Sequence, residues 1–536
     1  MRAQKLWSVA AMAVAGAGLA LPIVAVAQPV SHAAVAAVAG TGLKGDFNGD
    51  GFSDLAVGIP LEDVGGVANA GAVQVFFGSV FGLNGATGQL ITQDTGGVQG
   101  VAETNDQFGA AVIPGNFNGD AFTDLAIGVP FEDGSVADEG GVHVLYGSNN
   151  GLTANADEFF TQNTPGILET SETGDRFGSA LATANFGRSG QADLAVGAPA
   201  EDVAGAVDAG VVHTIYGTPN GLTAVASQLV RRGAGGINGA VGAGDGFGAV
   251  LTAADFGRGG QADLAVGVPD DDLPGAINAG SVHVIYGGAA GLAAPGNHQI
   301  TQNTGGVDDT SESQDRFGSA LAAADLGRSA QADLAIGVPA EDHSARGNAG
   351  AVHVLYGTAN GVSSAGESFL TQTTAGVNGV ADAFDRFGDA LVAANVGGSA
   401  TADLAIGVPF EDVGGAVDAG AVAVLYGAAN GVSTVNDQLL TQDTAGVIDA
   451  AEPADRFGET LAAGNFGLGN EADLAVGVPF ENVGAVVDAG GVHILYGSPA
   501  QVSTGPDLLL TQDTAGVPDV AETADQFGSV LAGRRG

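Results

Sequence analysis

Short apolar runs recur along the chain, and Gly, Pro, Asn and Asp separate them. One period reads "FGSALATA" (177–184), "DLAVGAP" (193–199), "GVVHTIYG" (210–217) and "SQLVRR" (227–232). The third run alternates with the period of two that is typical of a half-buried strand, and turn-forming residues mark the joins. No run keeps a helical period. The pattern therefore predicts four short antiparallel strands in each period.

This period occurs seven times. The segments DLAVG or DLAIG begin 69 or 70 residues apart, at Asp54, Asp124, Asp193, Asp263, Asp333, Asp403 and Asp473. One Phe-Gly pair recurs at the same place in each period, and these seven pairs begin at Phe108, Phe177, Phe247, Phe317, Phe387, Phe457 and Phe527. Seven repeats of four strands predict an all-β fold, a seven-bladed β-propeller of four-stranded antiparallel blades. A β-solenoid would need shorter repeats.

The two ends of the repeat array differ in phase. The first DLAVG has no Phe-Gly before it, and the last Phe-Gly has no DLAVG after it. We expect "FGSVLAG" (527–533) to supply the innermost strand of the blade that begins at Asp54, which closes the ring and removes the exposed sheet edges. The alternative is that "VAGTGLKG" (38–45) is a degenerate first strand and that the C-terminal strand begins an incomplete blade.

Composition narrows the classes of function. The 536 residues include 60 Asp and Glu against 15 Lys and Arg, a net charge of −45. Nucleic acids and anionic membranes bind basic surfaces, so we expect neither as a partner. The charge favours cations, either metal ions or basic ligands, although adaptation to high salt is an alternative origin of it. The absence of cysteine excludes disulfides and thiolate chemistry.

The N-terminus predicts export. Arg2 and Lys5 precede an apolar run from 6 to 27, and "AVA" (25–27) provides the small residues of a cleavage site. We expect a signal peptide over 1–27, cleaved after Ala27, then a short linker over 28–41 and the propeller over 42–536. An uncleaved anchor helix is the alternative. After cleavage we expect a secreted monomer with no stable membrane insertion.

The loop "DFNGDGFSD" (46–54) is a candidate metal site. Its oxygen side chains are Asp46, Asn48, Asp50 and Asp54, at positions 1, 3, 5 and 9. The backbone carbonyl of Phe52, at position 7, can complete the shell. Several hard oxygen ligands with more than one carboxylate suit Ca²⁺, whereas Mg²⁺ requires a smaller and stricter octahedron.

The second loop, "NFNGDAFTD" (116–124), repeats the pattern with one carboxylate fewer. Its candidate ligands are Asn116, Asn118, Asp120 and Asp124, with the carbonyl of Phe122 at position 7. We expect weaker calcium binding here. For both loops the alternative is an Asx-rich turn without metal.

The other five loops keep oxygen side chains only at positions 1 and 9, too few for a good calcium site. Three of them carry an arginine at position 4, namely Arg188, Arg258 and Arg328. We hypothesise that this guanidinium replaces the ion by bonding the position-9 carboxylate. A solvated arginine at the tip of the turn is the alternative.

The opposite face is predicted to be acidic. An acidic pair follows the second strand of every repeat, although Asn482 replaces the second acid in the last: Glu62-Asp63, Glu132-Asp133, Glu201-Asp202, Asp271-Asp272, Glu341-Asp342, Glu411-Asp412 and Glu481-Asn482. An Asp also stands two residues before each Phe-Gly. These carboxylates either form a docking surface or cap turns, and we favour turn-capping for the Asp before Phe-Gly. We expect the recurring third-strand histidines to pack inside blades: His143, His213, His283, His353 and His493.

The recurring Phe-Gly, together with segments such as "DFNGDGFSDLAVGIP" and "GAVQVFFG", resembles the FG-GAP repeat of the integrin α-subunit N-terminal propeller, which also occurs in secreted bacterial proteins. The resemblance extends from about residue 42 to the end and implies seven blades, calcium in some hairpin loops, and ligand contacts on the opposite face. We therefore expect a secreted calcium-binding adhesion module, without catalysis of its own, that binds a protein or glycan on its acidic face. The alternative is an extracellular hydrolase of polysaccharides or phosphoesters that uses that face.

Overall fold

The computed structural model describes residues 45–505 and 507–532, all within the compact unit formed by residues 32–536. The predicted signal peptide (1–27), the predicted linker (28–41) and residues 42–44 lie outside the described residues, so these boundaries stay predictions. In the described part of the chain every regular element is a strand. This part therefore has no helix of the length and apolar character needed to cross a membrane.

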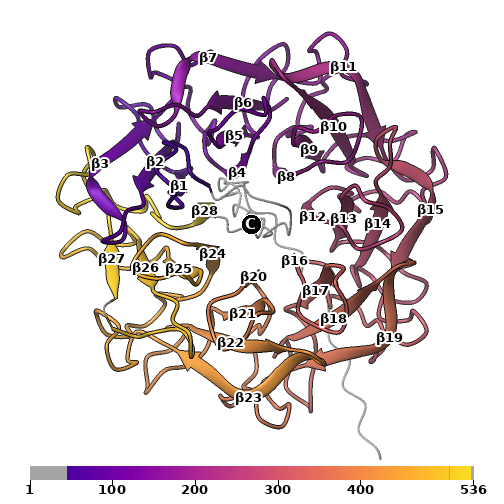
Figure 1. The fold of residues 1–536 in the computed structure, drawn as a ribbon. Coiled ribbons are helices and arrows are strands. Elements are labelled where there is room, and N and C mark those ends of the chain that lie inside the picture. Colours follow the sequence, from indigo (N-terminus) through magenta and orange to yellow (C-terminus); the bar gives the residue numbers. More distant parts are fainter. Residues whose placement is uncertain (1–44, 506, 533–536) are drawn as a thin grey trace, which may run out of the picture. The chain divides into compact units, whose positions relative to one another are not determined.

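The strands form seven four-stranded antiparallel sheets arranged around a common centre, so the fold is the predicted seven-bladed propeller (Figure 1). Blade 1 contains β28 (Val530–Ala532), β1 (Leu55–Ile59), β2 (Ala72–Phe77) and β3 (Asn84–Ile91). Blade 2 contains β4 (Ala111–Gly115), β5 (Asp124–Val129), β6 (Gly141–Tyr146) and β7 (Thr153–Phe160). Blade 3 contains β8 (Ala180–Ala184), β9 (Asp193–Ala198), β10 (Val211–Thr218) and β11 (Gly221–Val230).

The remaining blades follow the chain in the same order, from the innermost strand outwards. Blade 4 contains β12 (Val250–Ala254), β13 (Asp263–Val268), β14 (Ser281–Tyr286) and β15 (Ala293–Ile300). Blade 5 contains β16 (Ala320–Ala324), β17 (Asp333–Val338), β18 (Ala351–Thr358) and β19 (Gly361–Leu370). Blade 6 contains β20 (Leu391–Ala394), β21 (Asp403–Val408), β22 (Ala421–Ala428) and β23 (Gly431–Leu440). Blade 7 contains β24 (Thr460–Gly464), β25 (Asp473–Val478), β26 (Gly491–Leu495) and β27 (Leu508–Leu510).

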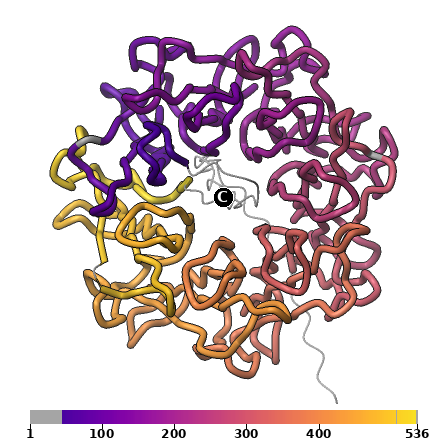
Figure 2. Tube along the Cα trace, in the orientation of Figure 1, coloured from indigo at the N-terminus to yellow at the C-terminus, as the bar shows by residue number. Residues whose placement is uncertain are grey.

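The ring closes as predicted. Strand β28 pairs antiparallel with β1, with Val57 opposite Leu531, so both ends of the repeat array build blade 1. Figure 2 shows the yellow C-terminal segment beside the indigo beginning of the array. The backbone N–H of Ser53 also donates to the carbonyl of Asn465 in blade 7, at 2.8 Å. Loop 46–54 immediately precedes β1 and therefore lies at the closure.

The core lies between blades rather than within them. Each of the seven buried apolar clusters combines residues of two neighbouring blades. The glycine of DLAVG permits this contact, because a Cβ on Gly197 would lie 2.2 Å from the carbonyl oxygen of Gly248 in the next blade. The recurring glycines therefore let the second strand of each blade approach the Phe-Gly turn of the next blade closely.

Two predicted strand boundaries are wrong. The innermost strand of blade 3 begins at Ala180 instead of Phe177, because the Phe-Gly pair forms a turn in which Gly178 has φ of 97°. The outermost strand covers Gly221–Val230 instead of 227–232. Its first half, which includes half-buried and exposed positions, pairs with β10 beyond a register shift between Thr214 and Tyr216. The register shift and the solvent-facing positions of this strand interrupt the alternation of apolar and polar residues on which the prediction depended.

Candidate functional site

The first acidic loop is a tight turn organised by its own oxygens. Gly49 and Gly51 have φ of 75° and 98°, which favours glycine. Asp46 accepts the N–H groups of Gly49 at 2.6 Å and Gly51 at 2.8 Å. The Oδ1 atom of Asn48 accepts the N–H of Asp50 at 2.8 Å, and Oδ1 of Asp50 accepts that of Phe52 at 3.0 Å. Positions 1, 3 and 5 therefore face one small turn.

Position 9 has a different role. Asp54 is fully buried, and its two oxygens accept the N–H groups of Phe47 at 2.7 Å and Gly78 at 2.9 Å. It thus joins the hairpin loop to the end of the third strand. The equivalent aspartate makes the same two kinds of bond in every blade: Asp124, Asp193, Asp263, Asp333, Asp403 and Asp473. Its recurrence is explained by this anchor, with or without metal.

The first loop gathers negative charge around a buried carboxyl. Burial raises the pKa of Asp54 to about 8, and the negative charges of Asp46 and Asp50 add to the rise, while the two backbone donors oppose it. A cation beside Asp54 would favour its ionised form. In residue type, this set of three carboxylates and an amide oxygen matches the ligands that a hard divalent cation prefers, although in the structure these oxygens accept backbone N–H groups.

The second loop repeats this arrangement less completely. Asn118 and Asp120 accept backbone N–H groups as their counterparts do, at 2.9 and 2.8 Å. The Nδ2 atom of Asn116, however, donates to the carbonyl of Asp120 at 2.7 Å. Asn185, in a loop without the acidic pattern, donates in the same way to Ser189. Burial raises the pKa of Asp124 to about 7. The second loop is thus intermediate between the first loop and the degenerate ones.

The two acidic loops lie side by side. The N–H of Thr123 donates to the carbonyl of Asp46 at 2.9 Å, and a Cβ on Gly49 would lie 2.7 Å from the ring of Phe122. Among residues 45–505 and 507–532, no three His, Cys, Asp or Glu side chains are arranged to hold a metal ion. The ligand roles of Phe52 and Phe122 through their carbonyls, and calcium itself, therefore stay predictions.

The hypothesis for the three loop arginines is wrong. In blade 3, Arg188 stacks on Tyr216, with its guanidinium carbon 4.0 Å from the ring centroid, instead of bonding Asp193. It donates to the carbonyl of Ala226 in its own blade at 2.5 Å and to that of Ala290 in blade 4 at 2.8 Å. The guanidinium therefore joins adjacent blades, because its planar fork can serve two carbonyls and one ring at once.

Arg258 and Arg328 make equivalent contacts. Arg258 lies 4.1 Å from the ring of Tyr286 and donates to Asn360 of blade 5 at 2.7 Å. Arg328 lies 3.7 Å from the ring of Tyr356 and donates to Asn430 of blade 6 at 2.8 Å. We call these three residues the arginine staples. They link blades 3 to 4, 4 to 5 and 5 to 6.

On the opposite face, the first acid of each pair forms a clamp between blades. Glu132 of blade 2 is buried and accepts a hydrogen bond from Gln93 of blade 1 at 2.5 Å. Five further pairs have the same form, and the last closes the ring: Gln162–Glu201, Gln302–Glu341, Gln372–Glu411, Gln442–Glu481 and Gln512–Glu62. We call these the Gln–Glu clamps. The sequence prediction missed the glutamine, although it recurs after Thr at a fixed position in six repeats.

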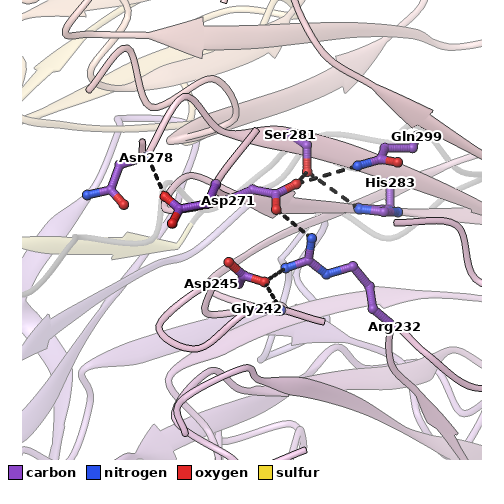
Figure 3. Close-up of polar contacts among 9 residues, drawn as sticks. Arg232, Gly242, Asp245, Asp271, Asn278, Ser281, His283 and Gln299 are labelled. Atoms are coloured by element: carbon purple, nitrogen blue, oxygen red, sulfur yellow. Dashed lines mark hydrogen bonds and ion pairs between the residues drawn. The ribbon is translucent and has the colours of Figure 1, made fainter. Parts of the chain in front are cut away.

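The clamp between blades 3 and 4 is ionic. Arg232 replaces the glutamine and points between Asp245 and Asp271 (Figure 3). It donates to Asp271 at 2.6 Å and also to Asp245, and all three side chains are buried. Asp271 in turn accepts the hydroxyl of Ser281 at 2.5 Å. One guanidinium thus serves two carboxylates here, where the other interfaces use a neutral amide.

The other recurring carboxylates cap turns, as we favoured for the Asp before Phe-Gly. Asp106 accepts the N–H of Glu103 at 2.7 Å, and its six counterparts accept the N–H three residues earlier. The second acid of each pair, such as Asp63, accepts an N–H from the same loop. The histidines pack inside blades as predicted, with ring centroids 5.4 to 5.5 Å from the Phe-Gly phenyl rings. Most of the recurring polar positions are therefore structural.

Known proteins share this pattern. The FG-GAP repeat model matches residues 39–76 and 108–145, the two segments that carry the acidic loops. Human phosphatidylinositol-glycan-specific phospholipase D is 33% identical over 180 residues, 34% of this chain and 20% of the relative. Integrin alpha-8 of Mus musculus is 31% identical over 245 residues, 45% of this chain and 20% of the relative. Integrin alpha-V of Gallus gallus is 28% identical over 198 residues, 35% of this chain and 16% of the relative.

The chain thus spans a fifth or less of the length of these relatives. The matched repeats, the sevenfold recurrence of Phe-Gly and DLAVG or DLAIG, and the closed ring of seven four-stranded blades agree with one another. The chain therefore contains FG-GAP repeats and folds as a seven-bladed β-propeller, and it is similar in sequence to segments of integrin alpha subunits.

Proposed function

We propose that this propeller is a secreted, calcium-binding adhesion or recognition module with no catalytic activity of its own. The observation that carries the proposal is loop 46–54, where Asp46, Asn48 and Asp50 face one turn at the closure of the ring. Similarity to integrin alpha subunits supports the binding role. Calcium would hold the hairpin of the blade that both chain ends build, and the ligand would bind on the opposite, acidic face.

Calcium titration by calorimetry tests this proposal. We expect two ions per chain, the tighter in loop 46–54 and the weaker in loop 116–124. Calcium should raise the melting temperature, because an ion that binds only the folded state stabilises it. An unchanged melt in EDTA would overturn the calcium part of the proposal, and more than about three ions would show that degenerate loops also bind.

An extracellular hydrolase is the second candidate, favoured by the 33% identity to phosphatidylinositol-glycan-specific phospholipase D. The buried glutamates of the acidic face argue against general acid–base work there, because the Gln–Glu clamps occupy them. Incubation of the secreted protein with a phosphatidylinositol-glycan and with polysaccharides tests this candidate. Turnover that Asp412→Asn or Asp418→Asn abolishes would establish a hydrolase and displace the first proposal.

A further inference from the structure

Blade 6 differs from the other six at one exposed position. Phe384, in the loop before β20, is 60% exposed and has φ of 75°. The same left-handed position carries small or polar residues elsewhere: Asn105, Gly174, Gly244, Gln314, Ala454 and Ala524. A bulky residue with positive φ is strained, and an exposed phenyl ring gains nothing from burial. Such an outlier is typical of a site where the side chain has a further use.

Phe384 lines a cavity of about 460 Å³ on the acidic face. One wall is the loop 382–386, and the other is the β21–β22 loop, which contributes Phe410, Val417 and Asp418. Blade 5 holds the backbone of loop 382–386, because the N–H of Phe384 donates to the carbonyl of Gly347 at 2.9 Å. The cavity thus lies between these two loops, and its volume is in the range of small-molecule sites.

Polar groups with unused bonding capacity surround the aromatic surface. The guanidinium of Arg386 lies over the ring of Phe410, 4.5 Å from its centroid; it donates no hydrogen bond within residues 45–505 and 507–532, and its charge lowers the pKa of the buried Glu459 against the effect of burial. The carboxylates of Asp382 and Asp418 likewise accept no hydrogen bond from those residues. The cavity therefore offers five N–H donors and two carboxylates beside an exposed ring.

We propose that this cavity binds a neutral carbohydrate, an inference that rests on the proposed recognition function and names its ligand class. The apolar C–H face of a pyranose would stack on Phe384, since the face of an aromatic ring carries negative charge density. Its hydroxyl groups would accept from Arg386 and donate to Asp382 and Asp418.

Charged ligands fit the cavity less well. A basic side chain would meet the guanidinium of Arg386, which already occupies the face of Phe410. An anion would meet Asp382, Asp412 and Asp418, which all line the cavity. A neutral polyol avoids both repulsions and uses donors and acceptors together.

Blade 7 provides an internal control. Arg456 lies 4.4 Å from the ring of Phe480 there, as Arg386 lies 4.5 Å from that of Phe410, and Arg456 also lies 4.6 Å from the ring of Phe410. Ala454, however, stands where blade 6 has Phe384. The substitution Phe384→Ala therefore converts the blade 6 cavity to the pattern of blade 7, at a backbone position that already holds alanine elsewhere in the ring. The variant is expected to fold.

The test measures binding of neutral glucose, galactose, mannose and N-acetylglucosamine oligosaccharides to the full chain by saturation-transfer NMR and calorimetry. We expect at least one of them to bind, Phe384→Ala to weaken it by about tenfold or more, and Phe384→Tyr to retain it. Phe81→Ala removes another exposed phenyl ring, 84% exposed in the β2–β3 turn, and should leave binding unchanged.

Three results would overturn the inference: no oligosaccharide binding below about 10 mM, binding that Phe384→Ala leaves intact, or Phe384-dependent binding of an arginine-rich peptide in place of sugars. The first two leave the calcium titration unaffected, because the hairpin loops lie on the other face of the ring. A failure of the carbohydrate site is therefore distinguishable from a failure of the calcium-binding module.

Discussion

The hairpin loops of blades 1 and 2 and those of blades 3 to 5 share one anchor and differ in the contacts around it. In all five, a buried position-9 aspartate such as Asp54 or Asp193 accepts two backbone N–H groups. Around that anchor, blades 1 and 2 place carboxylates and amides, whereas blades 3 to 5 place an arginine staple that contacts the next blade.

This difference separates two tasks that one loop performs. The position-9 aspartate fixes the hairpin to its own blade. The residues nearer the tip of the loop determine what the loop contacts beyond that blade. An arginine staple holds its loop through protein groups alone, by stacking on a tyrosine ring of its own blade and donating to a carbonyl of the next blade. The acidic loops instead collect negative charge and, on the proposed function, need calcium to offset it. The predictions below test this separation.

We expect loss of the position-9 aspartate to have the largest effect on stability, and to have it equally in the acidic loops of blades 1 and 2 and in the loops of blades 3 to 5. In EDTA, we expect Asp54→Ala and Asp193→Ala each to lower the free energy of unfolding by about 3 to 5 kcal/mol, because each leaves two buried backbone donors unsatisfied. Chemical denaturation measures this. If Asp193→Ala were harmless while Asp54→Ala was severe, the anchor would be a metal ligand first and the comparison would fail.

Calcium should stabilise the acidic loops of blades 1 and 2 and leave the loops of blades 3 to 5 unaffected. At about a hundred times its dissociation constant, an ion stabilises the folded state by about 2.7 kcal/mol. We expect Asp50→Ala to remove most of this gain and Asp120→Ala to remove less, since loop 46–54 braces the closing blade and holds one more carboxylate. Thermal melts with and without calcium measure both.

The control for this ordering is the same pair of variants in EDTA. Asp50 and Asp120 each accept one backbone N–H two residues ahead, at 3.0 and 2.8 Å, so their losses without calcium should be similar. A larger loss for Asp120→Ala in calcium would reverse the ordering of the two sites.

The arginine staples should give a moderate effect that calcium does not change. We expect Arg258→Ala to lower the free energy of unfolding by about 1 to 2 kcal/mol, through loss of the stacking on Tyr286 and of two donated hydrogen bonds. Arg258→Lys should not restore it, because an ammonium lacks the planar fork. Full rescue by lysine would mean that charge alone matters at this position.

The sequence predicted the features that repeat locally. Seven copies of DLAVG or DLAIG and Phe-Gly predicted the blades, and the unmatched ends predicted the pairing of β28 with β1. The fixed offset of Asp106 from Phe-Gly predicted its turn cap, because both partners lie within three residues. Such signals are readable because the chain repeats the same local environment seven times.

The contacts between blades were not readable in the same way. Arg188 donates to a backbone carbonyl 102 residues further along, and a carbonyl acceptor leaves no trace in residue identity. The partner of Glu132 is Gln93, 39 residues away in another blade. Only a fixed offset between the recurring glutamine and glutamate could have indicated that clamp.

The smallest effect concerns the pH dependence of stability. We expect it to be equal in blade 1, which has an acidic hairpin loop, and in blade 5, which has an arginine staple. Burial raises the pKa of Glu62 in blade 1 and of Glu341 in blade 5 from 4.5 to about 9, and neighbouring carboxylates add to the rise. Between these values the folded chain holds a proton that the unfolded chain has lost, so each group's stabilisation is complete below pH 4.5 and is lost as pH rises to about 9. Glu62→Gln and Glu341→Gln keep an acceptor for the clamping glutamine but cannot ionise. Each should therefore make the decline of unfolding free energy with pH shallower, by at most about 1 kcal/mol in total between pH 5 and 9, because solvent screens part of the shift. Denaturation between pH 5 and 9 measures the slopes, and unequal changes would mean that the difference between the hairpin loops extends to the opposite face.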